Sequence, residues 1–191
     1  MKSGLLILFS CITLVLPAQE YEKKEYTASR TENPPVINGV PDDEEWTEGE
    51  WAGDFWQYDP AEGAPVSQKT EFKLLYDDYN IYVAIKAYDT APDSIVSRMT
   101  RRDDTEGDEV SVALDSYFDQ RTAFGFTVSA AGVKGDLMWI DDGLTEDDSF
   151  DPIWYVKTGI FDWGWAAEMR IPLTQLRFSA SDQQVWGLEV L

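Results

Sequence analysis

Acidic and basic side chains crowd together in one short stretch, "RRDDTEGDEVSVALD", which runs from Arg101 to Asp115. Two carboxylates at a suitable separation could serve a glycosidase as acid and base. Several oxygens could hold a hard cation, and arginines could hold a carboxylated or hydroxylated ligand. Because the chain contains no histidine, serine–histidine catalysis, cysteine–histidine catalysis and histidine-ligated zinc are excluded.

Paired carboxylates are too common in this chain to mark a catalytic site. It has 36 Asp and Glu among 191 residues, so a pair at a catalytic separation is expected by chance. The candidates in and around the opening stretch are Asp103, Asp104, Glu106, Asp108, Glu109 and Asp115. We interpret the domain as non-catalytic, and we expect it to require no cofactor.

The two arginines at the start of the stretch have two interpretations. Arg101 and Arg102 could form ion pairs with the neighbouring aspartates, or they could bind a ligand. The structural role is the commoner one, and Arg121 presents the same choice. We keep Arg101 and Arg102 as candidate ligand-binding residues.

A second acid-rich loop, "DDGLTEDDSFD" at 141–151, is the candidate metal site. Its spacing is not that of an EF-hand, but calcium accepts six to eight oxygens, and a loop can supply some of them from its backbone. The candidate ligands are Asp141, Asp142, Asp147 and Asp148. The alternative is a solvated acidic loop.

The eight tryptophans provide surfaces on which an apolar sugar face could stack. Trp46, Trp165 and Trp186 lie in strand-like or anchoring patterns and are predicted to be in the core. The aromatic residues near loops or strand ends are better ligand candidates: Trp51, Trp56, Tyr58, Trp139, Trp154 and Trp163.

Apolar residues recur with a period of two along most of the chain, which indicates strands. A hairpin is predicted within 69–89 and a second one around Asp162-Trp163-Gly164, with further strands near 110–114, 122–129, 135–140 and 184–191. Helical signals are confined to a turn or two. The pattern predicts an all-β, two-sheet antiparallel sandwich of the jelly-roll or immunoglobulin-like type.

The N-terminus reads as an export signal. Residues 1–18 have Lys2, an apolar run and a small-residue cleavage site, and this run is too short to span a bilayer comfortably. Cleavage would remove Cys11, the only cysteine. We expect a tail at 19–30, one domain at 31–191, and a location in the periplasm, at the outer membrane or outside the cell.

The formal net charge of −21 disfavours nucleic acid and anionic membranes as partners. No segment after the leader is apolar enough to be a transmembrane candidate. The last predicted strand reaches Leu191 with no polar tail, and we therefore expect the chain to be part of a longer protein.

Four motifs in order resemble family 9 carbohydrate-binding modules and their DOMON-like relatives. They are "VINGVPDDEEW" at 36–46, "LLYDDYNIYVAIKAYD" at 74–89, "DEVSVALD" at 108–115 and "WAAEMRIPLTQL" at 165–176. The stretch at 100–136 resembles a subgroup found at the N-terminus of large exported Gram-negative proteins, ahead of a β-rich, barrel-like region.

The resemblance implies a non-catalytic accessory that binds a glycan in polysaccharide catabolism, and it includes structural calcium. It places the family's sugar-binding Glu, Gln and Arg at Ser111, Gly125 and Thr127, with one aromatic residue just before Asp108 and another beyond Leu191. Ser111 and Thr127 therefore join the candidate ligand-binding residues. The alternative is an interaction domain that packs on the missing C-terminal β-rich region without binding sugar.

Overall fold

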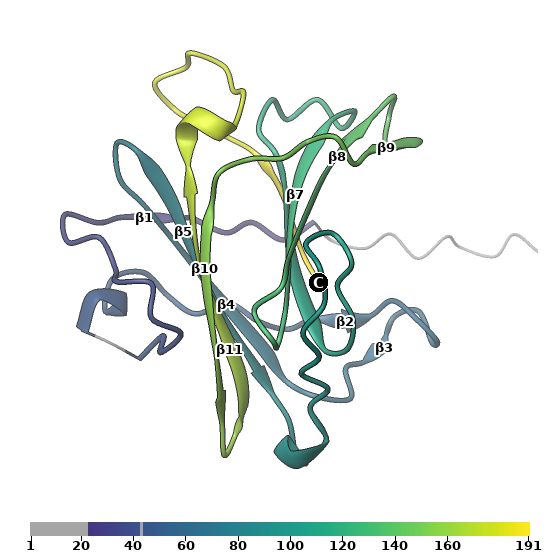
Figure 1. Ribbon diagram of the computed structural model, residues 1–191. Helices are drawn as coiled ribbons and strands as arrows, with labels where there is room; N and C mark the ends of the chain where they lie inside the picture. The colour runs from purple at the N-terminus through teal and green to yellow at the C-terminus, as the bar shows by residue number, and fades with distance from the viewer. Residues whose placement is uncertain (1–22, 43) are drawn as a thin grey trace, which may run out of the picture.

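A computed structural model describes residues 23–42 and 44–191, and the predicted signal peptide lies outside the described residues. Two five-stranded sheets face one another (Figure 1). The strand order is β1-β4-β5-β11-β10 in the first sheet and β12-β6-β7-β8-β9 in the second, and β2 and β3 form a separate ribbon. The predicted β-sandwich is confirmed.

The first sheet consists of β1 (Ser29–Arg30), β4 (Thr70–Tyr76), β5 (Asn80–Tyr88), β10 (Tyr155–Phe161) and β11 (Gly164–Pro172). The second consists of β6 (Glu109–Asp115), β7 (Ala123–Ser129), β8 (Lys134–Ile140), β9 (Thr145–Asp147) and β12 (Gly187–Val190). The ribbon pairs β2 (Trp56–Gln57) with β3 (Ala64–Pro65). Three 3-10 turns are η1 (Glu44–Trp46), η2 (Pro92–Ser94) and η3 (Leu173–Gln175).

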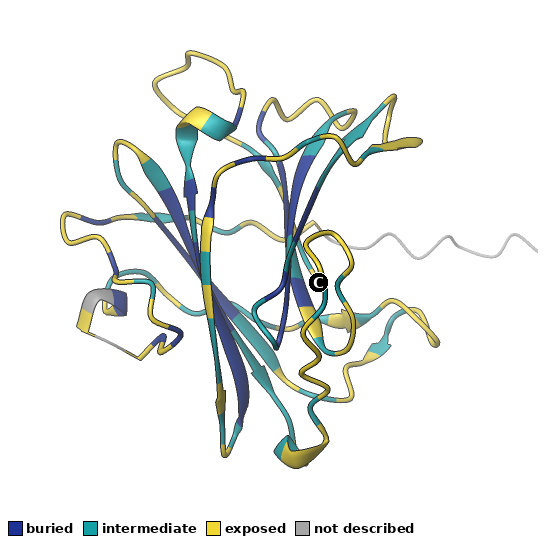
Figure 2. Cartoon of the chain, in the orientation of Figure 1, coloured by how far each residue is buried: buried dark blue, intermediate teal, exposed yellow. Residues whose placement is uncertain are grey.

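Alternation along the strands builds the core between the sheets. Val83 and Ile85 on β5 point inward and meet Val112 and Phe126 of the second sheet in one buried cluster. Figure 2 shows this buried layer along the facing strands. Burial of each such side chain stabilises the fold by roughly 1.5–3 kcal/mol. Because these side chains occupy the inner face of each strand, the residues between them lie on the outer face.

Three features of the sheets differ from the sequence prediction, and one is the short strand β9, which lies inside the predicted acid-rich loop at 141–151. Strand β1 pairs in parallel with β4, so the sandwich is not wholly antiparallel. The β2–β3 ribbon was not predicted, because only two residues on each side pair and they show no alternating run. Both predicted hairpins, β4–β5 and β10–β11, are confirmed.

The N-terminal segment at 31–51 covers the outer face of the first sheet. Glu168 on β11 is fully buried and accepts hydrogen bonds from the backbone N–H of Asn38 at 2.8 Å, that of Gly39 at 2.6 Å and the indole N–H of Trp46 at 2.5 Å. At Gly39 (φ +91°) an added Cβ would lie 2.8 Å from the Thr158 carbonyl oxygen. Glu168 therefore anchors this segment on the sheet.

Two lysines complete the contact between segment and sheet. Lys73 is buried, and its ammonium donates to the Trp46 carbonyl at 2.7 Å. Burial, with repulsion from Lys86, lowers the pKa of Lys73. Both ammonium groups lie over the Trp51 ring, at 5.1 Å for Lys73 and 4.3 Å for Lys86, and Lys86 also pairs with Asp42. Trp51 therefore has a packing role between the segment and the sheet.

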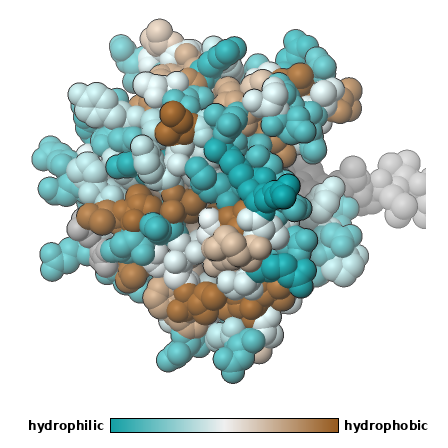
Figure 3. All heavy atoms as spheres, viewed as in Figure 1, coloured by the Kyte–Doolittle hydropathy of each residue, from teal (hydrophilic) through white to brown (hydrophobic). Residues whose placement is uncertain are grey.

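Hydrophilic residues dominate the face shown in Figure 3, and apolar residues reach the surface there only in separate patches. Within the described residues no helix has the length and apolar character needed to cross a membrane.

Candidate functional site

The outer face of the second sheet carries a floor of small residues, with Leu137 opposite Gly125 on the same face: Ser111, Ala113, Gly125, Thr127 and Gly135. Register places Ser111 opposite Thr127 and Thr127 opposite Gly135, while Ala113 lies opposite Gly125. Directly paired residues share a face of the sheet. Because their neighbours Val112 and Phe126 point into the core, the floor faces outward. The predicted Ser111 and Thr127 are brought together.

The two hydroxyls on the floor are available to a ligand. Both residues are partly exposed, and neither side chain makes a hydrogen bond with any other residue in the described part of the chain. The Cα atoms of such a directly opposed pair lie roughly 4.5–5.5 Å apart. Two hydroxyls at this spacing can donate to and accept from neighbouring groups of one polar ligand.

The side chain of Trp139 borders the floor. It lies on β8 opposite Ala123, and its ring extends over Gly125. A Cβ at position 125 would approach the ring atoms Cζ3 and Cη2 to 2.7 and 3.0 Å. The indole can lie flat there because Gly125 has no side chain, and it remains partly exposed. The predicted Trp139 thus joins the two hydroxyls in one site.

A loop before β6 closes the edge of β8 beside the floor. The backbone N–H of Asp103 donates to the Lys134 carbonyl at 2.9 Å, and the carboxylate of Asp103 accepts from the Asp136 N–H at 3.1 Å. The methyl group of Thr105 lies 3.4 Å from where a Gly135 Cβ would stand. This is where the resemblance placed the first aromatic residue; the loop supplies a small polar one instead.

Arg102 has a structural role, with a partner that the sequence analysis overlooked. Its guanidinium contacts both carboxylate oxygens of Asp136, at 2.9 and 2.7 Å, and forms an ion pair with Asp151 at 2.6 Å. The Asp136 side chain is 1% exposed and also accepts from the Trp154 indole at 3.0 Å. The predicted partners next to Arg102 in sequence are not used. An aspartate at an inward-facing strand position was the signal that could have identified Asp136.

Other carboxylates of the opening stretch serve the backbone or surface ion pairs. Asp108 accepts from the Val96 N–H at 2.7 Å, and Asp115 accepts from the Asp119 and Gln120 N–H groups at 3.1 and 2.7 Å. Glu106 pairs with Arg98 at 2.6 Å. These contacts fit the interpretation of the stretch as scaffold.

The four aspartates predicted to bind calcium do not form a cluster. No group of three or more acidic side chains in the described residues is placed to hold a metal. Asp142 pairs with Arg121 at 2.5 Å. Asp147 accepts from the Ser149 hydroxyl at 2.6 Å and its N–H at 3.0 Å, and these bonds lower the pKa of Asp147. Asp141 accepts from the Thr145 hydroxyl at 3.4 Å, and calcium binding by this loop stays a prediction.

The other predicted ligand residues lie away from the floor. Trp154 is 2% exposed and packs against Phe126 at 5.4 Å, so it has no open ring face. Trp56 on β2 and Tyr58 directly after it are highly exposed. Arg101 is exposed in the loop before β6. Of the predicted core tryptophans, Trp46 and Trp165 are buried, and Trp186 is partly buried against the core.

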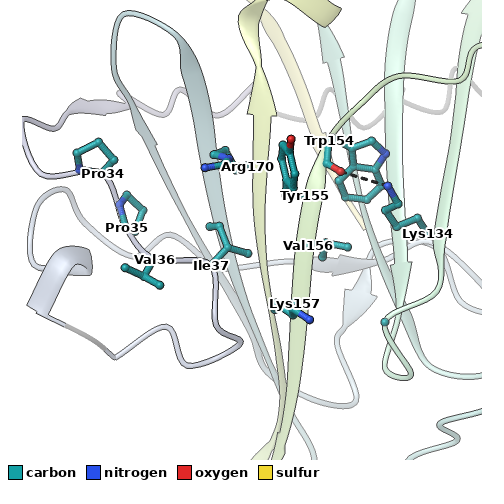
Figure 4. A pocket seen from close by; sticks show the side chains of 11 residues that line it. Pro34, Pro35, Val36, Ile37, Lys134, Trp154, Tyr155, Val156, Lys157 and Arg170 are labelled. Atoms are coloured by element: carbon teal, nitrogen blue, oxygen red, sulfur yellow. Dashed lines mark hydrogen bonds between the residues drawn. The ribbon is translucent and has the colours of Figure 1, made fainter.

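A separate groove runs between the N-terminal segment and β10. It is lined by Pro34, Pro35, Ile37, Tyr155 and Arg170, among others (Figure 4). The guanidinium carbon of Arg170 lies 4.1 Å from the centre of the Tyr155 ring. Apart from buried Trp154, none of the predicted site residues lines this groove.

The fold is that of a family 9 carbohydrate-binding module. The structure is similar to such a module from Caldicellulosiruptor kristjanssonii solved with cellotriose, with a TM-score of 0.61 and 23% identity over 87% of this chain and 75% of that one. A family 9 module from the same organism solved with glucose gives a TM-score of 0.60 and 23% identity over 88% of this chain and 76% of that one. No protein-family profile matches the sequence, and no curated protein matches it significantly.

Proposed function

We propose that this domain binds a saccharide on the outer face of its second sheet. The observation that carries the proposal is the pair of unbonded hydroxyls, Ser111 and Thr127, beside the Trp139 indole that lies over Gly125. An aromatic ring offers an apolar surface for a sugar face, and the hydroxyls can bond to the polar groups of the sugar. Few polar groups set in a largely apolar site are typical of small-molecule recognition.

The ligand class follows from the fold and from the chemistry of the floor. The two modules that share the fold were solved with glucose and cellotriose, so β-linked glucans are the first class to test. Where the family resemblance places charged or amide groups, the floor has Ser111, Gly125 and Thr127. Hydrogen bonds to neutral groups are about half as strong as charge-assisted ones; we therefore expect weaker binding than in modules that keep those groups.

A non-catalytic, accessory role in an exported protein is part of the same proposal. The leader-like residues 1–18 support export, and the use of the acids as scaffold supports binding without hydrolysis. The alternative, an interaction domain that binds no sugar, is favoured by the same replaced residues on the floor. Sugar binding by the isolated domain separates the two.

Isothermal titration of the domain with glucose, cellotriose and xylotriose tests the proposal. We expect saturable binding to one of these, with Ser111→Val and Thr127→Val each weakening it roughly fivefold through loss of one hydrogen bond of about 1 kcal/mol. Ser181→Ala, in an exposed loop, is the matched control and should bind as the wild type does. A folded domain that binds no glycan across plant, algal and bacterial panels would contradict the proposal.

A further inference from the structure

Two aromatic side chains are exposed to solvent at the β2–β3 ribbon, Trp56 within β2 and Tyr58 directly after it. Trp56 is 59% exposed and Tyr58 is 82% exposed, whereas Gln57 between them is partly covered. The exposed, partly covered, exposed order at 56–58 is that of an extended chain, which would put both rings on one side. Lys24 approaches the Trp56 ring at 6.0 Å and donates to the Asp54 carbonyl at 2.5 Å. The two rings form one exposed aromatic pair.

The ribbon is a fixed platform for this pair. Trp56 lies opposite Pro65, and the Gly63 N–H donates to the Gln57 carbonyl at 2.9 Å. Just before β2, Phe55 packs edge-on against Phe72 at 6.0 Å, and Phe72 belongs to the core. Aromatic side chains have only two rotatable side-chain angles and lose little conformational freedom on binding, which favours their use as contact surfaces.

One groove lies between the ribbon and β6, the strand that carries Ser111, although Ser111, Thr127 and Trp139 do not line it. Gln57 and Asp59 line this groove from the ribbon, and Glu109 and Leu191 line it from the second sheet. Leu191 exchanges two backbone hydrogen bonds with Ser111, at 2.9 and 3.0 Å. A chain-like ligand held at Ser111 could therefore continue toward the ribbon.

The charge of the groove restricts the class of ligand. Asp59, Asp108 and Glu109 all line it, in a chain whose formal net charge is −21. Acidic polysaccharides would be repelled from this path, since like charges on facing surfaces oppose association. A neutral saccharide chain would meet no such penalty.

We propose that Trp56 and Tyr58 form an added subsite for the further units of a neutral saccharide chain whose first units occupy the Ser111–Thr127–Trp139 site. This inference rests on the proposed function. It assigns the domain a ligand of several sugar units, with affinity that rises with chain length.

The test compares chain lengths in the wild type and in the double variant Trp56→Ala/Tyr58→Ala. The probes are glucose, cellotriose and cellohexaose, or the xylan series if that is the series that binds, with affinity measured by calorimetry. We expect wild-type affinity for the hexaose to exceed that for the triose by roughly five- to tenfold. The double variant should lose this gain and keep its affinity for the short sugar. Tyr79→Ala, which removes a 75% exposed ring on the β4–β5 turn, is the matched control and should keep the gain.

Three results would overturn the inference. Equal wild-type affinity for short and long chains would do so, as would a double variant that keeps the length dependence. An equal loss at every length would also do so, because it would place the effect at the first site or in the fold. In each case sugar binding, and with it the proposed function, would stand. Absence of binding to any sugar by the folded domain would overturn both.

Discussion

At the scale of single residues, the proposed site depends on the absence of a side chain at Gly125. In Gly125→Ala the new methyl group would stand 2.7 Å from the Trp139 ring, and the partly exposed ring would have to move. We expect saccharide affinity to fall several-fold while the melting temperature changes little, because a surface ring can shift where a core ring cannot. Calorimetry and thermal unfolding of the same samples check this. An unchanged affinity would show that the indole is not a wall of the site.

Arg102 and Arg121 each form an ion pair, and the two pairs differ in how deeply the aspartate is buried. Arg102 neutralises Asp136, which is 1% exposed, whereas Arg121 pairs with Asp142 where both side chains are more than 60% exposed. Removing one partner of a buried pair costs about 3–5 kcal/mol, and removing an exposed pair costs about 0–1 kcal/mol.

We therefore expect Arg102→Met to lower the free energy of unfolding by about 3 kcal/mol and Arg121→Met to leave it within about 1 kcal/mol. Urea denaturation of both variants measures the difference. Equal small losses would mean that Asp136 finds other compensation.

At the scale of elements, Glu168 joins the N-terminal segment to β11. Glu168→Ala would leave two backbone N–H groups and the Trp46 indole without their acceptor. Each unsatisfied buried donor costs about 1–3 kcal/mol, so we expect a loss of at least about 3 kcal/mol. Glu62→Ala, at an exposed position, is the control. If thermal unfolding showed the two variants to be equally stable, the segment would not depend on this anchor.

The β4–β5 turn should give the domain part of its acid sensitivity. Burial of Asp77 acts to raise its pKa, but bonds from the Tyr79 N–H, the Tyr82 hydroxyl and the Asn80 N–H outweigh it, and the pKa is lowered. Because the pKa of Asp77 is lower in the folded state, its carboxylate stabilises the fold at pH values above the unfolded pKa of about 3.9. This stabilisation is lost as the pH falls through the folded pKa.

Asp77→Asn keeps an acceptor but removes this titration. We expect the wild type to lose more stability than Asp77→Asn between about pH 6 and about pH 3, as measured by melting temperature at each pH. Parallel losses in the two proteins would assign the acid sensitivity to other groups.

How far the sequence predicts the structure depends on whether a feature is local. The hairpins and strands follow from alternation between Thr70 and Tyr88 and around Gly164, since each needs only neighbouring residues. The partners of Arg102 could not be predicted, because Asp136 and Asp151 reach it only through the sheet pairing. The meeting of Ser111, Thr127 and Trp139 likewise depends on the register of three strands.

At the scale of the whole molecule, the outer faces of the two sheets differ in what covers them. The segment at 31–51 covers the outer face of the first sheet and is anchored there by Glu168 and Lys73. The outer face of the second sheet keeps a floor of small residues beside a tryptophan and has the aromatic ribbon at its border. This asymmetry supports the proposal that the second sheet provides the binding surface.

The most direct test of this account maps a bound saccharide by amide chemical shifts in a titration of the domain with cellotriose, or with whichever sugar calorimetry identifies. We expect shifts concentrated at Ser111, Ala113, Gly125, Thr127 and the Trp139 indole, with little change on the first sheet. Shifts centred on the groove of Ile37 and Arg170, or none at all at saturating sugar, would contradict it.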